Sequence, residues 1–521
     1  MPRAFDTPQL LLPDAIAHHG RWRAGRPALI CGEARRSWAQ FDAATNRIAN
    51  GLIAAGLRKG DRIAVLMASS IEMVELMFGA GKAGVSVVPI NVSVSDAAVV
   101  AMLTDSGATA IAASGSHCGR IDQMDVAALR LKLAVDAPSP ARDWTGVAHW
   151  RDAQSPTSPN VAIAPGDECN IIYSSGTTGL PKGIVHSQGC RRNWAIDLGL
   201  ALRYHSGAVT VCSIGLYSNI MWATMLSTLL LGGTIVVLPS FSVPELLDAI
   251  QQHRVTHGAF VPVQLQRLLE RGVQGSDVGS LQAIMCCGSP LPLAVKREIP
   301  HRLGCALIEL YGLTEGLVTT LDPEDFERKI ESVGRPLPGQ RLKLVGADDR
   351  EVAAGYAGEI VGLGRVVMDG YHNRPDATLE ATWTDDAGLR WLRTGDIGRL
   401  DDEGFLYLLD RKKDLILSGG QNIYPADLEA VLLEHRAVVD VAVIGIPDER
   451  WGETPLAIVV PHTADSTDAC ISAAELRDWA NARLGKQQRI TAVIFVAQLP
   501  RNPNGKILKR ELRTTYAAFH V

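Results

Sequence analysis

Between two apolar segments the chain reads Tyr173-Ser174-Ser175-Gly176-Thr177-Thr178-Gly179-Leu180-Pro181-Lys182-Gly183. Ile171–Tyr173 on one side and Ile184–Val185 on the other are typical of buried strands. Glycines allow backbone N–H groups to turn toward one point, and such a loop, with hydroxyl donors and a lysine, can bind a polyphosphate. A flexible Ser/Gly linker is the alternative, but the strands on both sides favour an ordered loop. It is not a Walker A loop, because Pro181 and Gly183 flank Lys182 where that pattern has Gly and then Ser or Thr.

Length and composition predict a cytoplasmic protein of several domains. The chain has 521 residues, too many for one compact core, and 47% of them are apolar. A net charge of −5 gives no support for a nucleic-acid-binding surface. The nine cysteines form neither a CxxC pair nor a zinc-binding spacing, which suits a reducing compartment. The most membrane-like stretch, Met221–Leu238, is divided by Gly232-Gly233, so we expect a buried helix and strand and no integral membrane span.

Strand and helix patterns alternate through the first part of the chain. Strands are predicted at 62–66, 85–89, 109–113, 209–213, 234–238, 258–261, 282–287 and 306–310, and helices at 41–52, 71–78, 97–103 and 219–231. Residues 138–166, rich in Pro, Ser and Ala, are interpreted as a connector. The alternation is typical of doubly wound parallel sheets, and we expect two α/β subdomains that face each other with the phosphate loop near their seam. Ligands of such sheets bind at the carboxyl ends of strands, and the phosphate loop, 288–291 and 311–316 all follow predicted strands.

The pattern changes twice after residue 333. From 333 to 410 Gly and Pro are frequent and helix patterns are absent apart from 375–381, which predicts a mostly β subdomain. From 411 onward helices at 425–435 and 472–484 and strands at 438–446, 455–461 and 490–496 predict a compact α+β domain. The predicted domains are therefore 1–410 and 411–521, with the boundary at Asp410–Asp414.

Four further motifs carry groups suited to a nucleotide. Tyr311-Gly312-Leu313-Thr314-Glu315 offers a ring for stacking on a base and a carboxylate, a hard oxygen ligand for Mg²⁺. Gly288-Ser289-Pro290-Leu291 ends the strand 282–287 and, taken alone, is an ordinary turn. Arg393-Thr394-Gly395-Asp396 supplies a carboxylate that can accept two ribose hydroxyls, whereas the charged run Asp410–Asp414 is by itself typical of a solvated face. The segment 499–506 is rich in Pro and Asn and presents Lys506 on a tight loop.

In this order the loop and the motifs resemble those of the acyl-adenylate-forming enzymes, which include acyl-CoA synthetases, luciferases and peptide-synthetase adenylation domains. The resemblance implies a set of ATP-binding residues, namely Ser174, Ser175, Gly176, Thr177, Thr178, Gly179, Lys182, Gly288, Ser289, Tyr311, Gly312, Thr314, Asp396, Arg411 and Lys506. It implies that Tyr311 stacks on adenine and that Asp396, with Arg411 as a further donor, binds the ribose hydroxyls. It also implies that Thr178 and Glu315 hold Mg²⁺ and act in catalysis together with Lys506. The sequence departs from the family at Glu309, where many relatives have Gln.

The resemblance also implies that the C-terminal domain is a mobile lid. Its hinge would be Lys413, and the loop Ser418–Pro425 would line a tunnel for the pantetheine of coenzyme A (CoA). Gly419 and Gly420 are the CoA-binding candidates, because glycines allow a ligand to approach the backbone closely. Trp451 is a further candidate, for which a plain surface aromatic is the alternative. A rotating lid is expected because the two half-reactions need different groups at one carbonyl.

The activity implied by the family is that of an AMP-forming carboxylic acid–CoA ligase. ATP converts the acid into an acyl-adenylate with release of pyrophosphate, and CoA then displaces AMP. No carrier-protein segment follows Lys506, so we expect CoA as the acceptor. The alternative is a stand-alone enzyme that loads a carrier protein. A binding protein that has lost catalysis is disfavoured because Lys182, Glu315, Asp396 and Lys506 are all present. A homodimer is compatible with the sequence.

The acid itself is suggested by a small set of apolar positions. Gly215-Leu216-Tyr217-Ser218-Asn219 departs from the family, which often has Pro at the first and His at the fourth of these positions. The candidate acyl-pocket residues are Tyr217, Ser218, Trp222, Phe260, Gly312 and Leu317. This set offers no evident counter-charge, which favours an aryl, cyclic or medium-chain monocarboxylic acid over a dicarboxylate or an amino acid. Trp222 would close the pocket and favour aryl acids, with a plain core position on the helix 219–231 as the equally weighted alternative.

Overall fold

The structure of the protein, a computed structural model, describes residues 9–136, 143–174, 181–418, 421–448, 450–462, 471–485, 488–501, 506–517 and 519. The chain divides into two compact units. The first comprises Met1–Ile330, Pro336–Arg341 and Gly362–Leu392, and the second comprises Glu331–Arg335, Leu342–Val361 and Arg393–Val521. The predicted boundary at Asp410–Asp414 marks the hinge of the expected lid domain. That boundary stays a prediction.

The two strands on either side of the phosphate loop belong to a sheet with eight strands among the described residues, in the order β19-β9-β8-β4-β3-β5-β6-β7. They are β3 (Arg62–Leu66), β4 (Ser86–Pro89), β5 (Ala110–Ser114), β6 (Leu131–Val135), β7 (Thr145–Gly146), β8 (Glu168–Ser174), β9 (Lys182–Ser187) and β19 (Gly370–Tyr371). Strands from β8 to β7 run parallel, whereas β9 and β19 are antiparallel to their neighbours. The central strands are buried on both faces, as their unbroken apolar runs predict. The strands predicted at 62–66, 85–89 and 109–113 are confirmed.

A second sheet has nine strands in the described part of the chain, in the order β16-β15-β14-β13-β12-β10-β11-β1-β2. They are β1 (Pro27–Cys31), β2 (Ala34–Ser37), β10 (Val209–Cys212), β11 (Thr234–Val237), β12 (His257–Phe260), β13 (Ala283–Cys286), β14 (Ala306–Leu313), β15 (Gly316–Leu321) and β16 (Arg335–Pro336). The predicted strands are confirmed, but β14 is longer than expected. Tyr311-Gly312-Leu313 was expected to follow the strand 306–310 and instead continues it, because these residues pair with β15 in an antiparallel hairpin.

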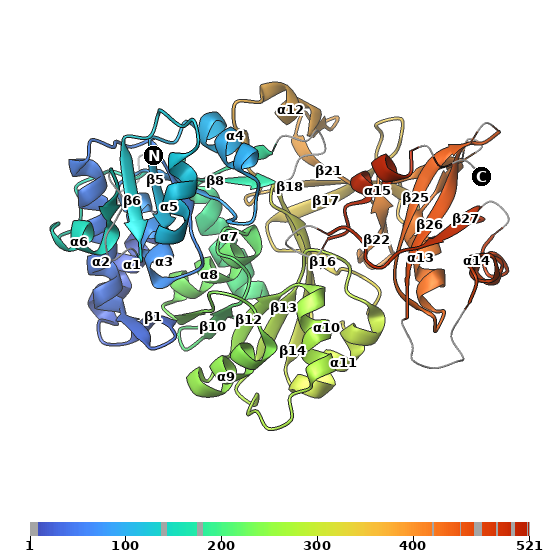
Figure 1. Cartoon of the computed structure of the whole chain (residues 1–521), viewed down its shortest axis with the longest axis horizontal. Coiled ribbons are helices and arrows are strands. Elements are labelled where there is room, and N and C mark those ends of the chain that lie inside the picture. The colour runs from blue at the N-terminus through green and yellow to red at the C-terminus, as the bar shows by residue number, and fades with distance from the viewer. Residues whose placement is uncertain are drawn as a thin grey trace. The chain divides into compact units, whose positions relative to one another are not determined.

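Helices connect and cover these strands (Figure 1). They are α1 (Leu12–Trp22), α2 (Trp38–Ala54), α3 (Ile71–Lys82), α4 (Asp96–Ser106), α5 (Gly115–Asp122), α6 (Val147–Asp152), α7 (Gln188–Ala201), α8 (Asn219–Leu231), α9 (Val243–His253), α10 (Pro262–Arg271) and α11 (Leu293–Leu303). The predicted helices are confirmed, and Met221–Leu238 is indeed the buried helix α8 followed by β11. The prediction of a connector at 138–166 was wrong at β7 and α6. These two elements are too short to give a periodic pattern in the sequence. None of the helices that the structure describes is long and apolar enough to cross a membrane.

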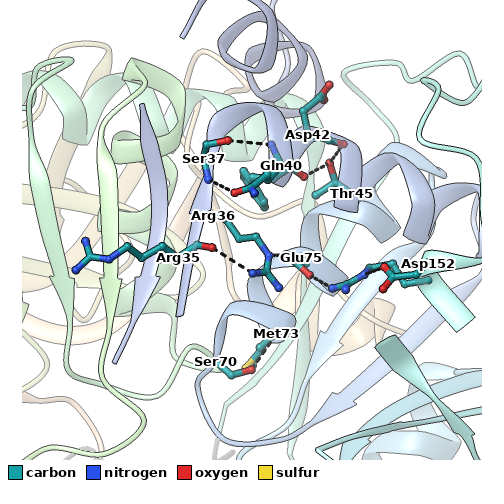
Figure 2. A network of polar contacts seen from close by, with 12 residues as sticks. Arg35, Arg36, Ser37, Gln40, Asp42, Thr45, Ser70, Met73, Glu75 and Asp152 are labelled. Carbon is teal, nitrogen blue, oxygen red and sulfur yellow. Dashed lines mark hydrogen bonds and ion pairs between the residues drawn. The ribbon is translucent and has the colours of Figure 1, made fainter. Parts of the chain in front are cut away.

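A buried ionic network links the two sheets (Figure 2). Glu75 on α3, between β3 and β4, is 1% exposed and accepts hydrogen bonds from Arg36 Nε of β2 at 2.8 Å and from Arg151 of α6 at 2.6 Å. Burial raises the pKa of Glu75, and the two arginines oppose that rise. Because a buried carboxylate needs charged partners, this network fixes β2 of the nine-stranded sheet against the helices of the eight-stranded sheet.

Two smaller sheets complete the fold, and their strand orders are given for the described residues. The third sheet has the order β17-β18-β21-β20, with β22 paired to β21, and contains β17 (Gln340–Val345), β18 (Ala357–Gly364), β20 (Thr382–Thr384), β21 (Arg390–Leu400) and β22 (Leu406–Arg411). The fourth has the order β24-β23-β26-β25, with β27 paired to β26, and contains β23 (Ile416–Ser418), β24 (Gln421–Ile423), β25 (Val438–Asp448), β26 (Gly452–Pro461) and β27 (Ala492–Phe495). The remaining helices are α12 (Pro375–Glu380), α13 (Pro425–Leu433), α14 (Ala473–Asn481) and α15 (Lys509–Thr515). The β-rich segment and the α+β segment are thus confirmed.

Candidate active site

The base of the phosphate loop is the antiparallel hairpin of β8 and β9. Ser174 and Lys182 are cross-strand partners at the end of the hairpin that leads into the loop, and Tyr173 and Gly183 form the next pair. A Cβ at Gly183 would lie 2.8 Å from Cγ2 of Ile171 and 3.1 Å from the ring of Tyr173, so a larger residue there would force these side chains to shift. The structure thus brings Ser174 and Lys182 together, while Ser175, Gly176, Thr177, Thr178 and Gly179 lie outside the described residues.

Tyr371 lies beside this hairpin, on the short strand β19. It pairs with Ile184 of β9 in the sheet. Its ring centroid lies 4.9 Å from Nζ of Lys182, within the range of a cation–π interaction. Its hydroxyl donates a 2.9 Å hydrogen bond to Oε1 of Glu315. Tyr371 therefore connects the lysine predicted to bind phosphate with the carboxylate predicted to bind Mg²⁺.

Thr314 and Glu315 form the turn between β14 and β15. Glycine is required at 312 before this turn, because a Cβ there would lie 2.7 Å from the carbonyl oxygen of Leu317. The backbone N–H of Met368 donates to the carbonyl oxygen of Glu315 at 2.7 Å. The ring of Tyr311, predicted to stack on adenine, is buried at the beginning of this hairpin, opposite Thr319.

The turn is also held by His186 of β9. Nδ1 of His186 accepts a hydrogen bond from Arg191 at 3.2 Å, so that its proton is on Nε2, which donates to the carbonyl oxygen of Thr314 at 2.8 Å. Burial lowers the pKa of His186 well below its usual value, and Arg191 adds to this effect. The ring is therefore neutral and has a single tautomer that suits both contacts.

The carboxyl ends of β12, β13 and β14 meet at one edge of the nine-stranded sheet. Phe260, Cys286 and Glu309 are neighbours in register across these parallel strands. The turn that begins at Gly288 therefore lies at the same edge as Tyr311, which continues β14 beyond its pairing with β13. Gly288 has a φ of +98°, a backbone conformation that favours glycine.

Glu309, the departure from the family pattern, has a defined partner. Its carboxylate forms a buried ion pair with Lys296 of α11 and accepts from the backbone N–H of Leu291. Burial raises the pKa of Glu309, and Lys296 opposes that rise. Glu309 thus holds the turn 288–291, which contains the predicted ATP-binding residues Gly288 and Ser289.

The acyl-pocket candidates after β10 have clear local roles. Ser218 caps α8 by accepting a hydrogen bond from the N–H of Ile220. Tyr217 is half-buried, and a Cβ at Gly215 would lie 2.1 Å from its ring, so Tyr217 accounts for Gly at that position. Trp222 is buried in the core, where Nε1 donates to the carbonyl oxygen of Leu216 at 3.0 Å.

The other candidates, Phe260 and Leu317, are also buried. Leu317 has a φ of +58°, which is rare for a leucine and indicates backbone strain immediately after the Thr314–Glu315 turn. A Cβ at Gly362 would lie 2.7 Å from the side chain of Leu317, so this strained leucine packs against a glycine of β18. That these residues together bind an acyl group stays a prediction.

In the second unit the structure brings Asp396, Arg411 and Lys506 together. Asp396 of β21 and Arg411 of β22 are cross-strand partners, with 3.1 Å between Oδ1 and Nε. Asp396 is 7% exposed, as expected for a carboxylate that binds a ribose. The pKa of Lys506 is lowered to about 8, mainly by burial and also by the neighbouring Arg411, while Asp396 opposes the shift. The lysine predicted to be catalytic therefore belongs to the same cluster as the pair predicted to bind ribose.

The other predicted residues of the second unit are Lys413, Trp451, Gly419 and Gly420. Lys413 is exposed in the turn after β22. Trp451 is 47% exposed and has the guanidinium carbon of Arg450 4.7 Å from its ring centroid. Gly419 and Gly420 lie outside the described residues.

Glu315 is suited to a magnesium ion held mainly by a nucleotide. Mg²⁺ is commonly bound by one or two carboxylates together with phosphate oxygens. One oxygen of Glu315 accepts from Tyr371, and the second oxygen could bind an ion. Among the described residues no group of three or more His, Cys, Asp or Glu could hold a metal by itself. The residues present fit Mg²⁺ that arrives with ATP.

Two residues of this site were missed by the sequence analysis. Tyr371 is far from Glu315 in the chain, and His186 follows the phosphate loop on a strand that was read as buried and apolar. The dipeptide Gly370-Tyr371 before the predicted helix 375–381 was a visible but weak sign of an ordered turn. Contacts across strands that bring distant residues together leave no local pattern in the sequence.

Comparison with known proteins shows the family of the chain. The model of the AMP-binding enzyme family matches residues 16–372, and that of the AMP-binding enzyme C-terminal domain matches residues 427–506. A long-chain-fatty-acid–CoA ligase of Mycobacterium tuberculosis is 34% identical over 496 residues, which cover 93% of this chain and 94% of the relative. A feruloyl-CoA synthase of an Amycolatopsis species is 33% identical over 486 residues, which cover 92% and 94%.

Two further proteins are relevant to the acceptor and to the ion. A fatty acid–[acyl-carrier-protein] ligase of Streptomyces coeruleorubidus is 32% identical over 525 residues, which cover 98% of this chain and 97% of the relative. The crystallised o-succinylbenzoate coenzyme A synthetase of Bacillus subtilis, in complex with ATP and a magnesium ion, is similar with a TM-score of 0.83 and 30% identity, covering 96% of this chain and 99% of that one.

Proposed function

The chain belongs to the AMP-binding enzyme family, as an enzyme of the acid–CoA ligase type, and from this premise we propose that it activates an apolar monocarboxylic acid with ATP and transfers the acyl group to CoA. The acid is an aryl, cyclic or medium-chain fatty acid. The observation that carries the proposal is the linkage of Lys182 and Glu315 through Tyr371. Tyr371 contacts both the ammonium of Lys182 and the carboxylate of Glu315, and a cation and a carboxylate for Mg²⁺ are the groups that a triphosphate requires.

The first half-reaction makes the acid reactive. A carboxylate is a poor acylating agent because its leaving group would be oxide, so a carboxylate oxygen attacks the α-phosphorus of ATP and pyrophosphate leaves. Lys182 and the Ser/Thr/Gly loop bind the departing pyrophosphate, and Tyr311 and Asp396 bind the adenosine. Glu315 and Thr178 would hold Mg²⁺, which would supply positive charge at the phosphate oxygens.

Lys506 stabilises the charge that builds on the α-phosphate in this step. A point ammonium can contact both the attacking carboxylate and the phosphate oxygens in the transition state. In the second half-reaction the thiolate of CoA attacks the acyl carbonyl, and AMP leaves with the bridging oxygen. Rotation of residues 411–521 about Lys413 would exchange Lys506 for the Gly419–Gly420 loop and Trp451 between the two steps.

The charges near the Gly288 turn support an acid with a single carboxylate. The side chains closest to a Cβ built at Gly288 are those of Ile220 and Val261, which are apolar. Lys296, a buried cation on the nearby helix α11, is already paired with Glu309. It therefore offers no counter-charge to a second carboxylate on the substrate. The relatives named for fatty acids and for ferulate act on acids of this kind.

The runner-up is a ligase that loads a carrier protein, favoured by the similarity to the Streptomyces acyl-carrier-protein ligase. One experiment separates the two. A panel of aryl, cyclic and fatty acids is first screened with ATP and Mg²⁺ for acids that raise the melting temperature. The best acids are then offered with CoA or with a phosphopantetheinylated carrier protein, and AMP and thioester are measured. Acyl-CoA and AMP in equal amounts support the proposal; thioester on the carrier protein alone would replace it with the runner-up.

A further inference from the structure

Tyr371 contacts the two charged groups on which triphosphate binding depends. Its ring lies under the ammonium of Lys182, and its hydroxyl donates to Oε1 of Glu315. Its backbone is fixed as well: its N–H donates to Oγ1 of Thr378 at 3.0 Å, and the next residue, His372, donates to the carbonyl oxygen of Gly183 at 2.7 Å. The side chain is therefore anchored to the sheet that carries the phosphate loop.

The arrangement solves a problem of opposite charges close together. A lysine and a glutamate that meet directly form an ion pair, and each then has less charge to offer to a ligand. Here the ring of Tyr371 contacts the lysine and its hydroxyl contacts the glutamate. The phenol O–H donates to a carboxylate oxygen, which can only accept, so the direction of this hydrogen bond is fixed.

We propose that Tyr371 is a positioning residue that directs Glu315 toward Mg²⁺ and holds the ammonium of Lys182 toward the phosphates of ATP. With Oε1 engaged by the hydroxyl, Oε2 is the oxygen that faces the ion. A cation over an aromatic face keeps its N–H donors available on the side away from the ring. The inference rests on the proposed ATP-dependent function and adds a residue that orients both halves of the MgATP site.

The test measures binding without turnover. Calorimetric titration of a non-hydrolysable ATP analogue at a series of Mg²⁺ concentrations gives the Mg²⁺ concentration at half-maximal affinity. Tyr371→Phe keeps the ring and removes the hydroxyl, so this concentration is expected to rise about tenfold, the lower end of the effect of removing a partner of a metal-binding side chain. Tyr371→Leu removes the ring as well, and affinity at saturating Mg²⁺ is then expected to fall a further few-fold.

A matched control exists in the second unit. Tyr407 also donates its hydroxyl to a carboxylate, that of Asp401 at 3.1 Å, and also lies under a cation, Arg399 at 5.2 Å. Tyr407→Phe should leave the Mg²⁺ dependence unchanged. In a Glu315→Gln background, Tyr371→Phe should cause no further change, because its hydroxyl acts through that carboxylate.

A Tyr371→Phe variant with wild-type Mg²⁺ dependence would overturn the inference and leave the proposed function intact, whereas a wild-type protein that binds no MgATP analogue would contradict both. Should Tyr371→Phe fail to fold, Thr378→Val takes its place, since it removes the acceptor of the Tyr371 N–H, together with a hydrogen bond to the carbonyl oxygen of Arg374. A rise in the required Mg²⁺ in that variant supports the inference, and an unchanged requirement overturns it.

Discussion

Nε2 of His186 donates a 2.8 Å hydrogen bond to the carbonyl oxygen of Thr314, the residue before the predicted metal ligand. The two residues are joined although one follows the phosphate loop and the other lies in the β14–β15 turn. Together with the contact from Tyr371 to Glu315, this bond ties strands β9 and β19 to the β14–β15 turn. These residues of the first unit, which are predicted to bind ATP, are thus held by contacts across strands.

Replacing His186 by Phe should weaken both stability and nucleotide use. The change leaves the partly buried Thr314 carbonyl without the donor from His186, which should lower the free energy of unfolding by about 1–3 kcal/mol. If displacement of the Thr314–Glu315 turn costs the transition state a similar free energy, kcat/KM for ATP should fall by about tenfold or more. Denaturant unfolding and pyrophosphate exchange measure the two effects. His205→Phe is the control, because His205 contacts Gln282 at the surface; equal behaviour of the two variants would refute the role of His186.

Replacing Glu309 by Gln should destabilise the fold, even though many relatives have Gln there. The variant leaves Lys296 buried without its counter-charge, and breaking a buried pair in this way costs about 3–5 kcal/mol. The double variant Glu309→Gln with Lys296→Met removes both charges and should recover most of that loss. Unfolding in guanidinium chloride measures each variant. A single variant as stable as the wild type would mean that the pair contributes nothing to the turn 288–291.

The rate of adenylation should fall as the pH rises through about 8. The pKa of Lys506 is lowered to about 8 because the side chain is buried near Arg411, so the ammonium loses its proton above that pH. The pH profile of kcat/KM for ATP reports the ionisation of the free enzyme. Lys506→Arg, which keeps its charge at these pH values, should be slower but should lack this decline. A wild-type profile that stays flat up to pH about 10, near the ordinary pKa of lysine, would contradict the assignment.

Lys506→Ala should separate the two half-reactions. Loss of one donor to the transition state costs about 3–4 kcal/mol in adenylation, whereas CoA transfer from supplied acyl-adenylate should be unchanged. Pyrophosphate exchange measures the first step and thioester formation from synthetic acyl-adenylate the second. Equal losses in both assays would show that Lys506 serves the fold or the lid and not the phosphoryl chemistry.

Much of the first unit could be predicted from the sequence because its strands are short apolar runs buried on both faces. β3 and the helix α8 have the predicted bounds. What the sequence could not show is pairing over long distances. β1 pairs with β11, which lies about two hundred residues later in the chain, and β2 pairs with β1. β14 extends through Tyr311 because β15 folds back on it.

The candidate site divides in the same way. Lys182, Glu315, Asp396 and Lys506 stand in motifs whose chemistry can be interpreted from a few adjacent residues. Tyr371 and His186 act through single side-chain contacts to residues far away in the chain, so no local pattern marks them. Trp222 had two interpretations of equal weight, and its packing against Leu216 and Arg191 is that of a core residue.

The most direct test of the central claim follows one oxygen atom. An acid selected by the melting-temperature screen is labelled with ¹⁸O in its carboxylate and incubated with the enzyme, ATP, Mg²⁺ and CoA. If the carboxylate attacks the α-phosphorus and CoA then displaces AMP, mass spectrometry should find one ¹⁸O in AMP and none in pyrophosphate. Label in inorganic phosphate with formation of ADP, or thioester formed with unlabelled AMP, would contradict the acyl-adenylate mechanism.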